Sequence, residues 1–114
     1  MINVLIEKGF QPKSLAHITG GGLLDNVPRV FPAGFAAEIN VNSWPKIPIF
    51  QFLIENLDLE INELYRTFNM GIGLTIIVDP SQKDQLVNML GQNRCFEIGV
   101  ITPNSSKRVY LNDK

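Results

Sequence analysis

The sequence is poor in the residues on which many protein chemistries depend. It has one cysteine, Cys95, and one histidine, His17, among 114 residues. A lone cysteine cannot form an intramolecular disulfide, and one cysteine with one histidine are too few for a zinc site. We therefore expect no metal centre in this chain. Cys95 has only Arg94 as a basic neighbour, which favours an inert core thiol over a nucleophile.

An excess of charge of one sign is also lacking. Ten basic and eleven acidic side chains leave a net charge of −1. This balance gives no electrostatic footprint for nucleic acid or for an anionic lipid surface. No apolar run approaches the ~20 residues of a membrane helix, and residues 1–10 lack the apolar centre of a signal peptide. We therefore expect a cytoplasmic protein with no nucleic-acid or membrane partner.

The sequence does contain a run of three glycines, Gly20 to Gly22, between two apolar segments. Residues 15–19 alternate as a strand does, and residues 23–27 have the apolar spacing of a short helix. A strand–glycine–helix turn directs backbone N–H groups toward one point at the positive end of a helix, which is the geometry of an anion site. A tight turn without a ligand is the alternative, because a glycine-rich loop taken singly is a weak signal.

The remaining hydrophobic patterns predict an α/β or α+β sandwich, with helices packed on one mixed sheet of about five strands. Strand patterns cover residues 15–19, 35–41, 74–78, 96–101 and 108–111. Helix patterns cover residues 1–8, 23–27, 48–56, 61–68 and 81–90. We expect residues 1–114 to form a single domain. The first helix has no N-cap residue, which suggests that it begins further upstream.

Local signals refine these elements. Pro28 cannot donate a helical hydrogen bond, so the short helix after the glycines kinks or restarts there, with Asn26 able to cap the restart. Ser81 and Asp84 have the spacing of a capping box at the start of the last helix, and Gly91 suits its end.

A second glycine pair stands at the entry of the central strand. The continuous β-branched run at residues 74–78 predicts a strand that is buried on both faces. Gly71 and Gly73 lie on one side of its entry, where bulk is excluded and something packs or binds closely. Arg66 and Asn69 border this pair. An arginine there can pair with a phosphate or can cap a helix end, and the residues alone leave both roles open.

Two segments carry a specific resemblance when they are taken together. The first is HITGGGL at residues 17–23, followed by Asn26, Pro28 and Arg29, and the second is YRTFNMGIG at residues 65–73. In this order and spacing they resemble the aminoimidazole ribonucleotide synthetase family, also called phosphoribosylformylglycinamidine cyclo-ligase. The resemblance covers about residues 1–111. Family members are considerably longer and have two α/β halves, so this chain resembles most of the C-terminal half.

The resemblance implies an ATP-dependent enzyme of purine biosynthesis that closes a ring to make aminoimidazole ribonucleotide. The ATP-binding N-terminal half of the family, with its glycine loop and magnesium carboxylates, is absent from this chain. ATP and magnesium therefore belong to the full-length family, and neither is expected to bind tightly here. The implied partners are a phosphorylated ribonucleotide substrate, the N-terminal half if it is separately encoded, and a further copy, since family members act as homodimers.

Glycine geometry and the resemblance together nominate a set of substrate- or phosphate-binding residues, while no catalytic residue is assigned. They are His17, Thr19, Gly20, Gly21, Gly22, Asn26, Arg29, Arg66, Asn69 and Gly71. Besides Arg66, two of them keep alternatives, since His17 also suits a satisfied, partly buried histidine and Arg29 faces either the glycine loop or water. The alternative function is a non-catalytic α/β module that binds a phosphorylated metabolite.

Overall fold

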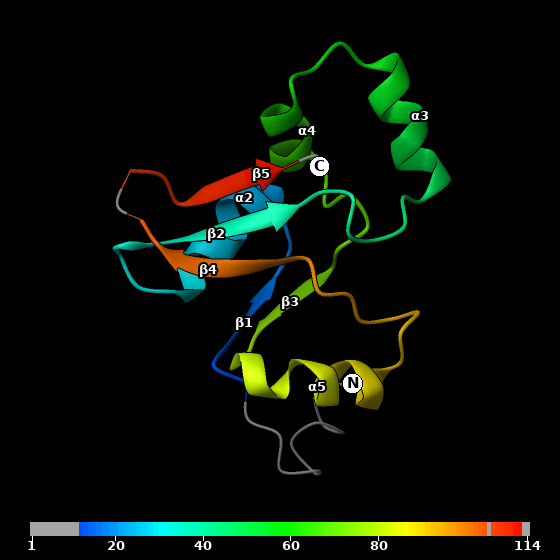
Figure 1. Ribbon diagram of the computed structural model, residues 1–114. Coiled ribbons are helices and arrows are strands. Elements are labelled where there is room, and N and C mark those ends of the chain that lie inside the picture. Colours follow the sequence, from blue (N-terminus) through cyan, green and yellow to red (C-terminus); the bar gives the residue numbers. More distant parts are fainter. Residues whose placement is uncertain (1–11, 105, 113–114) are drawn as a thin grey trace.

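The computed structural model describes residues 12–104 and 106–112, in which short strands alternate with short helices (Figure 1). The elements in chain order are β1 (Ser14–His17), α2 (Gly22–Asn26), the 3-10 turn η1 (Val27–Val30), β2 (Phe35–Asn40), α3 (Pro48–Asn56), α4 (Ile61–Thr67), β3 (Leu74–Ile77), the 3-10 turn η2 (Pro80–Gln82), α5 (Lys83–Leu90), β4 (Gly99–Pro103) and β5 (Val109–Asn112). This mixture confirms the expected α+β class. The helix predicted at residues 1–8 lies outside the described residues.

The described strands form two sheets rather than the one mixed sheet that the sequence predicts. β1 and β3 make an antiparallel pair, and β2 lies between an antiparallel β4 and a parallel β5. The number and the mixed character of the strands agree with the prediction. Their division into two sheets does not, because a strand pattern records which face is apolar and not which other strand supplies the hydrogen bonds.

β3 differs from its prediction in burial. The sequence predicts a strand buried on both faces, yet all its residues are only partly buried. Its single hydrogen-bonded neighbour among the described strands is β1. Leu74 to Val78 also line an apolar groove that β3 shares with α5 and β4. The sequence pattern correctly identified an apolar strand. The described part of the chain, however, leaves β3 more exposed than a strand inside a parallel sheet would be.

The core lies where α2 and α4 pack on the strands. Leu23 of α2 exposes none of its surface, and Tyr65 of α4 exposes 2%. The Tyr65 ring meets Trp44 edge to face, with 6.4 Å between the ring centroids. The buried Trp44 Nε1 donates to the Met70 carbonyl oxygen at 3.0 Å, so its polar atom is satisfied inside the core. These contacts hold α4, against which α2, the helix that follows the glycine loop, is packed.

The ends of the last helix and the last strands differ from the predictions by a few residues. Asp79, rather than Ser81, is the capping residue: its carboxylate accepts from the Ser81 amide at the start of η2, and α5 begins only at Lys83. Gly91 ends α5 with φ at +95°, as predicted. β4 begins at Gly99 rather than at residue 96. A Cβ on Gly99 would overlap the Glu38 carbonyl of the neighbouring strand β2.

Candidate functional site

The two glycine segments, far apart in the sequence, meet in the fold. The Ile18 amide donates to the Gly73 carbonyl oxygen at 2.9 Å, which joins the end of β1 to the entry of β3. Gly22 has φ at +61°, and a Cβ there would overlap the Tyr65 carbonyl oxygen at the end of α4. Gly22 is therefore required by close packing of two backbones as well as by its conformation. The two motifs make one continuous junction.

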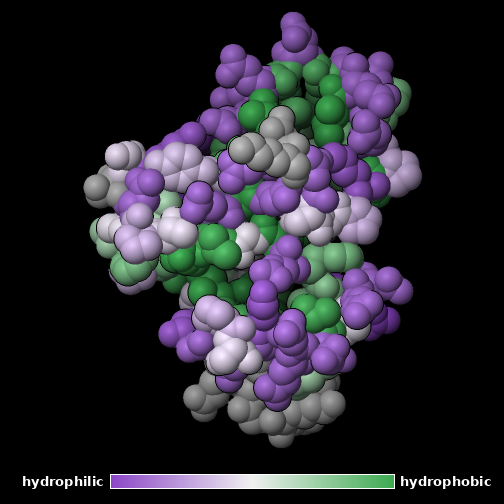
Figure 2. All heavy atoms as spheres, in the orientation of Figure 1, coloured by the Kyte–Doolittle hydropathy of each residue, from purple (hydrophilic) through white to green (hydrophobic). Residues whose placement is uncertain are grey.

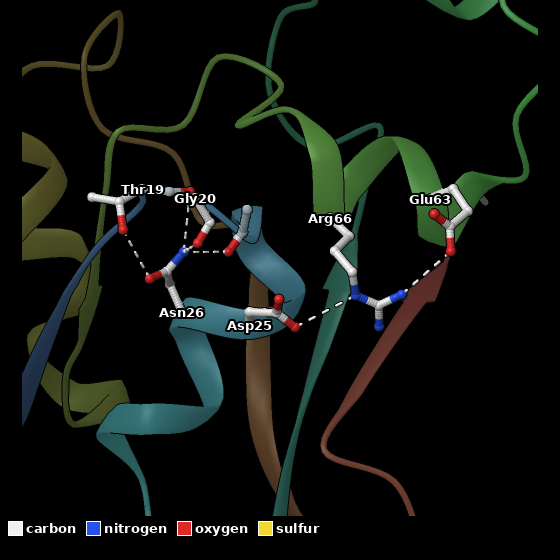
Figure 3. Close-up of polar contacts among 7 residues, drawn as sticks. Thr19, Gly20, Asp25, Asn26, Glu63 and Arg66 are labelled. Atoms are coloured by element: carbon white, nitrogen blue, oxygen red, sulfur yellow. Dashed lines mark hydrogen bonds and ion pairs between the residues drawn. The ribbon is translucent and has the colours of Figure 1, made fainter.

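Asn26 organises the glycine loop from inside. Its buried Nδ2 donates to the carbonyl oxygens of Gly22 at 2.8 Å and of Thr19 and Gly20 at 3.2 Å each (Figure 3). The Thr19 hydroxyl donates to Asn26 Oδ1 at 3.2 Å. The prediction that Asn26 caps the restarted helix is wrong, because its side chain makes no cap bond to η1 and turns back to the loop. The restart itself is confirmed, since α2 gives way to η1 with Pro28 in its first turn.

The backbone amides of the loop are not equivalent. The Gly22 amide donates to the Thr19 carbonyl oxygen at 3.0 Å, so this nominated residue has no free amide to offer a phosphate. The amides of Gly20 and Gly21 have no acceptor among the described residues. Gly21 adopts φ at +96°, a conformation that side chains disfavour. Two of the three glycine amides are thus without an acceptor in the described part of the chain.

A carboxylate that the sequence analysis did not nominate lies beside these amides. Asp25 Oδ2 is 2.6 Å from the place where a Cβ on Gly21 would stand. Arg66 Nε lies 3.5 Å from Asp25 Oδ1, and Arg66 Nη1 lies 3.5 Å from Glu63 Oε1 (Figure 3). All three side chains are about half exposed, so these ion pairs contribute little to stability. Their importance is electrostatic, because the carboxylates of Asp25 and Glu63 offset the positive charge of Arg66 beside the loop.

Of the two carboxylates that pair with Arg66, only Glu63 could have been identified from the sequence. Glu63 and Arg66 are three residues apart on a helix, a spacing that pairs side chains. Asp25 and Arg66 are 41 residues apart, so their contact depends on how α2 packs against α4.

The other nominated residues divide into two groups. Arg29 Nη1 donates weakly to Asn26 Oδ1 at 3.4 Å, which confirms that Arg29 faces the glycine loop. His17 is exposed on β1 rather than partly buried. Asn69 and Gly71 instead form a separate turn, in which Asn69 Oδ1 accepts from the Gly71 amide at 2.8 Å. A Cβ on Gly71 would stand 3.2 Å from Ile47, so the predicted close packing is confirmed at Gly71. It is wrong at Gly73, where nothing lies within 4 Å of a Cβ.

The structure adds three further facts about the described residues. No three metal-ligating side chains gather in residues 12–104 and 106–112. Burial raises the pKa of the Cys95 thiol, which supports its interpretation as an unreactive group. None of the helices in this part of the chain is long and apolar enough to cross a bilayer.

The fold and the junction define an α+β domain built around paired glycine motifs. Comparison with known proteins then identifies it: the family model described as "AIR synthase related protein, C-terminal domain" matches residues 1–112, and the chain belongs to this family. The resemblance found in the sequence is therefore confirmed.

Several relatives are named phosphoribosylformylglycinamidine cyclo-ligase. The chain is 42% identical over 96 residues to that of Bifidobacterium longum strain DJO10A, covering 82% of this chain and 28% of the relative. It is 47% identical over 87 residues to that of Geobacillus kaustophilus, covering 76% and 25%. It is 40% identical over 108 residues to that of Staphylococcus aureus strain MRSA252, covering 93% and 32%. The chain thus spans about a quarter to a third of the length of these relatives.

Proposed function

We propose that this chain is the C-terminal portion of a phosphoribosylformylglycinamidine cyclo-ligase and supplies the glycine-loop wall of its substrate site. The complete enzyme would use ATP to close the ring of formylglycinamidine ribonucleotide, giving aminoimidazole ribonucleotide in purine biosynthesis. One observation carries the proposal. The family resemblance depends on two glycine motifs. The hydrogen bond between Ile18 and Gly73 brings these same two motifs together. Motifs that meet in space while far apart in sequence commonly serve one site.

In this proposal the loop holds the phosphate of the ribonucleotide. The amides of Gly20 and Gly21 are the donors, and the Thr19 hydroxyl becomes a third only if it releases Asn26 Oδ1, to which it donates at 3.2 Å. Arg66 and Arg29 supply positive charge from α4 and η1. A phosphate must compete with Asp25 for Arg66, because that carboxylate already lies 3.5 Å from the guanidinium. The exchange costs little, since the existing pair is half exposed. His17 and Asn69, at the edges of this site, are weaker contributors.

The complete enzyme requires parts that this chain does not span. When bound, ATP supplies the activation of the amide oxygen that precedes ring closure. The described residues gather no set of magnesium ligands, so we assign the metal and ATP to the remainder of the enzyme and derive no step through them. The N-terminal half and a second subunit are the proposed protein partners, and the cytoplasm is the proposed compartment.

A phosphate titration followed by backbone amide shifts tests the loop. We expect inorganic phosphate and ribose 5-phosphate to shift the Gly20 and Gly21 amides with roughly millimolar affinity, which corresponds to about −4 kcal/mol. Gly21→Val should abolish these shifts, because its side chain would collide with Asp25. Gly34→Val is the matched control, since Gly34 also has positive φ but open space around it. Asp25→Asn should tighten binding by removing the competing charge, and His17→Ala should weaken it only slightly.

Two outcomes would count against the proposal. If the amides near Arg66 and Asn69 move while those of Gly20 and Gly21 stay still, the anion site lies at the second motif. Steady-state assay of the chain with formylglycinamidine ribonucleotide, ATP and magnesium should show no turnover. Rates near those of ordinary enzymes, about 1–10³ per second, would show that the chain is not a portion of the enzyme but a complete one.

A further inference from the structure

The surface and the interior of the molecule differ in polarity. Figure 2 shows hydrophilic side chains over much of the visible surface, with apolar ones between them. Among the buried residues that the structure describes, by contrast, Asn26 is the one with an amide or charged side chain, and it exposes 5% of its surface. Burying an amide is costly unless its hydrogen bonds are made. The position of Asn26 therefore calls for an explanation beyond filling the core.

Both polar atoms of the Asn26 side chain are engaged with the protein itself. The carbonyl oxygens of Thr19, Gly20 and Gly22 share the two hydrogens of Nδ2 at 2.8 to 3.2 Å. On the other side, Oδ1 accepts from the Thr19 hydroxyl at 3.2 Å and from Arg29 Nη1 at 3.4 Å. A flipped amide would place Oδ1 against the carbonyl oxygens, so these contacts fix its orientation. Asn26 thus has no free donor to offer a phosphate.

The same hydrogen bonds set the direction of two backbone amides. In a trans peptide unit, the carbonyl of one residue and the N–H of the next point in opposite directions. Asn26 holds the carbonyls of Thr19 and Gly20, so the amides of Gly20 and Gly21 point away from it. These are the two glycine amides that have no acceptor within the described ranges, and Gly20 is exposed. The buried side chain therefore determines which way the loop presents its donors.

An asparagine suits this place better than a side chain of the same shape. It offers donors to the loop carbonyls on one side and an acceptor to Thr19 and Arg29 on the other, without adding charge. An aspartate would turn a second acceptor toward the carbonyl oxygens. Its negative charge would also lie beneath the loop and repel a phosphate.

We propose that Asn26 is a positioning residue of the phosphate site and not one of its ligands. It holds the Gly20 and Gly21 amides outward before a phosphate arrives, so binding does not have to order them. Ordering the backbone of even one residue on binding would lower the affinity by about tenfold. This role rests on the proposed function of the loop, whereas the order of the loop can be measured without a ligand.

Backbone ¹⁵N relaxation of the ligand-free chain tests the positioning directly. In the wild type, Gly20 and Gly21 should be as ordered as a strand, with order parameters of about 0.85. Asn26→Leu keeps the size of the side chain but removes its polar atoms, and should lower both values below about 0.6. Asn26→Ser repeats the test if Asn26→Leu does not fold, as judged by circular dichroism. Leu86→Ala, which truncates a buried side chain of α5, is the matched control and should leave the loop ordered.

Titration with inorganic phosphate separates positioning from direct contact. Followed at the Gly20 and Gly21 amides, Asn26→Leu should bind at least about tenfold more weakly than the wild type. Leu86→Ala should bind as the wild type does. In the wild type, the side-chain amide protons of Asn26 should shift less than the two glycine amides, because the phosphate does not touch them.

The inference is overturned if the loop of both Asn26 variants is as ordered as that of the wild type, or if they bind phosphate equally well. A phosphate-induced shift that is largest at the Asn26 side chain would make this residue a ligand and overturn it too. If the wild-type amides do not respond to phosphate at all, the proposed function of the loop fails. The order parameters then still decide whether Asn26 fixes the two amides.

Discussion

The glycine junction and the apolar groove are built from the same kinds of element but differ in how completely they are packed. At the junction, Leu23 is fully buried and Asn26 makes four hydrogen bonds within the loop. At the groove, β3 is half-buried and Leu86 is the one buried residue of α5. An isolated two-stranded sheet such as β1–β3 is marginally stable in water. The difference shows that the described chain completes one side of its core and leaves the other open.

The largest expected effect comes from adding one methyl group to the junction. Gly22→Ala should destabilise the fold by about 4 kcal/mol or more, because the new Cβ overlaps the Tyr65 carbonyl and the residue must keep positive φ. Gly20→Ala is the matched control, since nothing lies within 4 Å of a Cβ there. Urea unfolding followed by circular dichroism measures both. Equal midpoints for the two variants would contradict the close approach of the two backbones.

A pair of leucine truncations compares the two regions directly. Leu23→Ala should cost about 4–5 kcal/mol and Leu86→Ala about 2–3 kcal/mol, within the range known for Leu→Ala in protein cores. The reason is that Leu23 exposes no surface, whereas the groove beside Leu86 lets neighbours and water adjust. The measurement is the difference in free energy of unfolding at constant denaturant slope. A larger cost at Leu86 would reverse the comparison.

Arg108 links the junction to β5 and should have an intermediate effect. Its guanidinium donates to the carbonyl oxygens of Pro28, Phe31, Pro32 and Phe35, and it lies 4.4 Å from the centre of the Phe31 ring. Arg108→Ala should cost about 2–3 kcal/mol, since it leaves several carbonyls without their charged donor. Arg108→Lys should recover only part of this, because an ammonium cannot match the fork of donors. Thermal unfolding of both variants gives the test, and full recovery in Arg108→Lys would contradict it.

The smallest expected effect is a dependence on alkaline pH. Burial raises the pKa of Tyr65 above its ordinary value of 10.0. The native state therefore holds this proton more tightly than the unfolded state, so stability from this group is unchanged below about pH 10 and falls as the pH rises through the native pKa. Cys95 shifts in the same direction, so the measurement uses a Cys95→Ala background. Tyr65→Phe should flatten the alkaline fall, and an unchanged slope would contradict the assignment.

Patterns of short range were read correctly from the sequence. The helix predicted at residues 48–56 forms as α3 over the same residues, with Pro48 in its first turn. The alternation of residues 15–19 predicted a strand, and Ala16 and Ile18, which share one of its faces, are both buried. Gly91 ends the last helix as predicted. Each signal depends on the conformational preference of one residue or on the period of a few neighbours, and both are properties of the local chain.

Contacts between distant segments were not recoverable in the same way. Nothing in the pattern around Asn26 indicated that its amide would turn inward and hold three loop carbonyls. Asp25 was not nominated, although it stands next to Gly21 and pairs with Arg66. The exposure of large apolar side chains on α3, such as Ile49 and Phe52, was not predictable either, because periodicity shows that a helix has an apolar face without showing what covers it.

The α+β class, the two glycine motifs and the family to which the chain belongs can all be read from the amino-acid sequence. They follow from residue identities and spacings, which persist whatever the chain packs against. The division of the strands into two sheets, the meeting of the two motifs through Ile18 and Gly73, and the carboxylate beside the loop became known only from the fold. Strand pairing and side-chain contact depend on which segments reach the same place, and that depends on the packing of the entire chain at once.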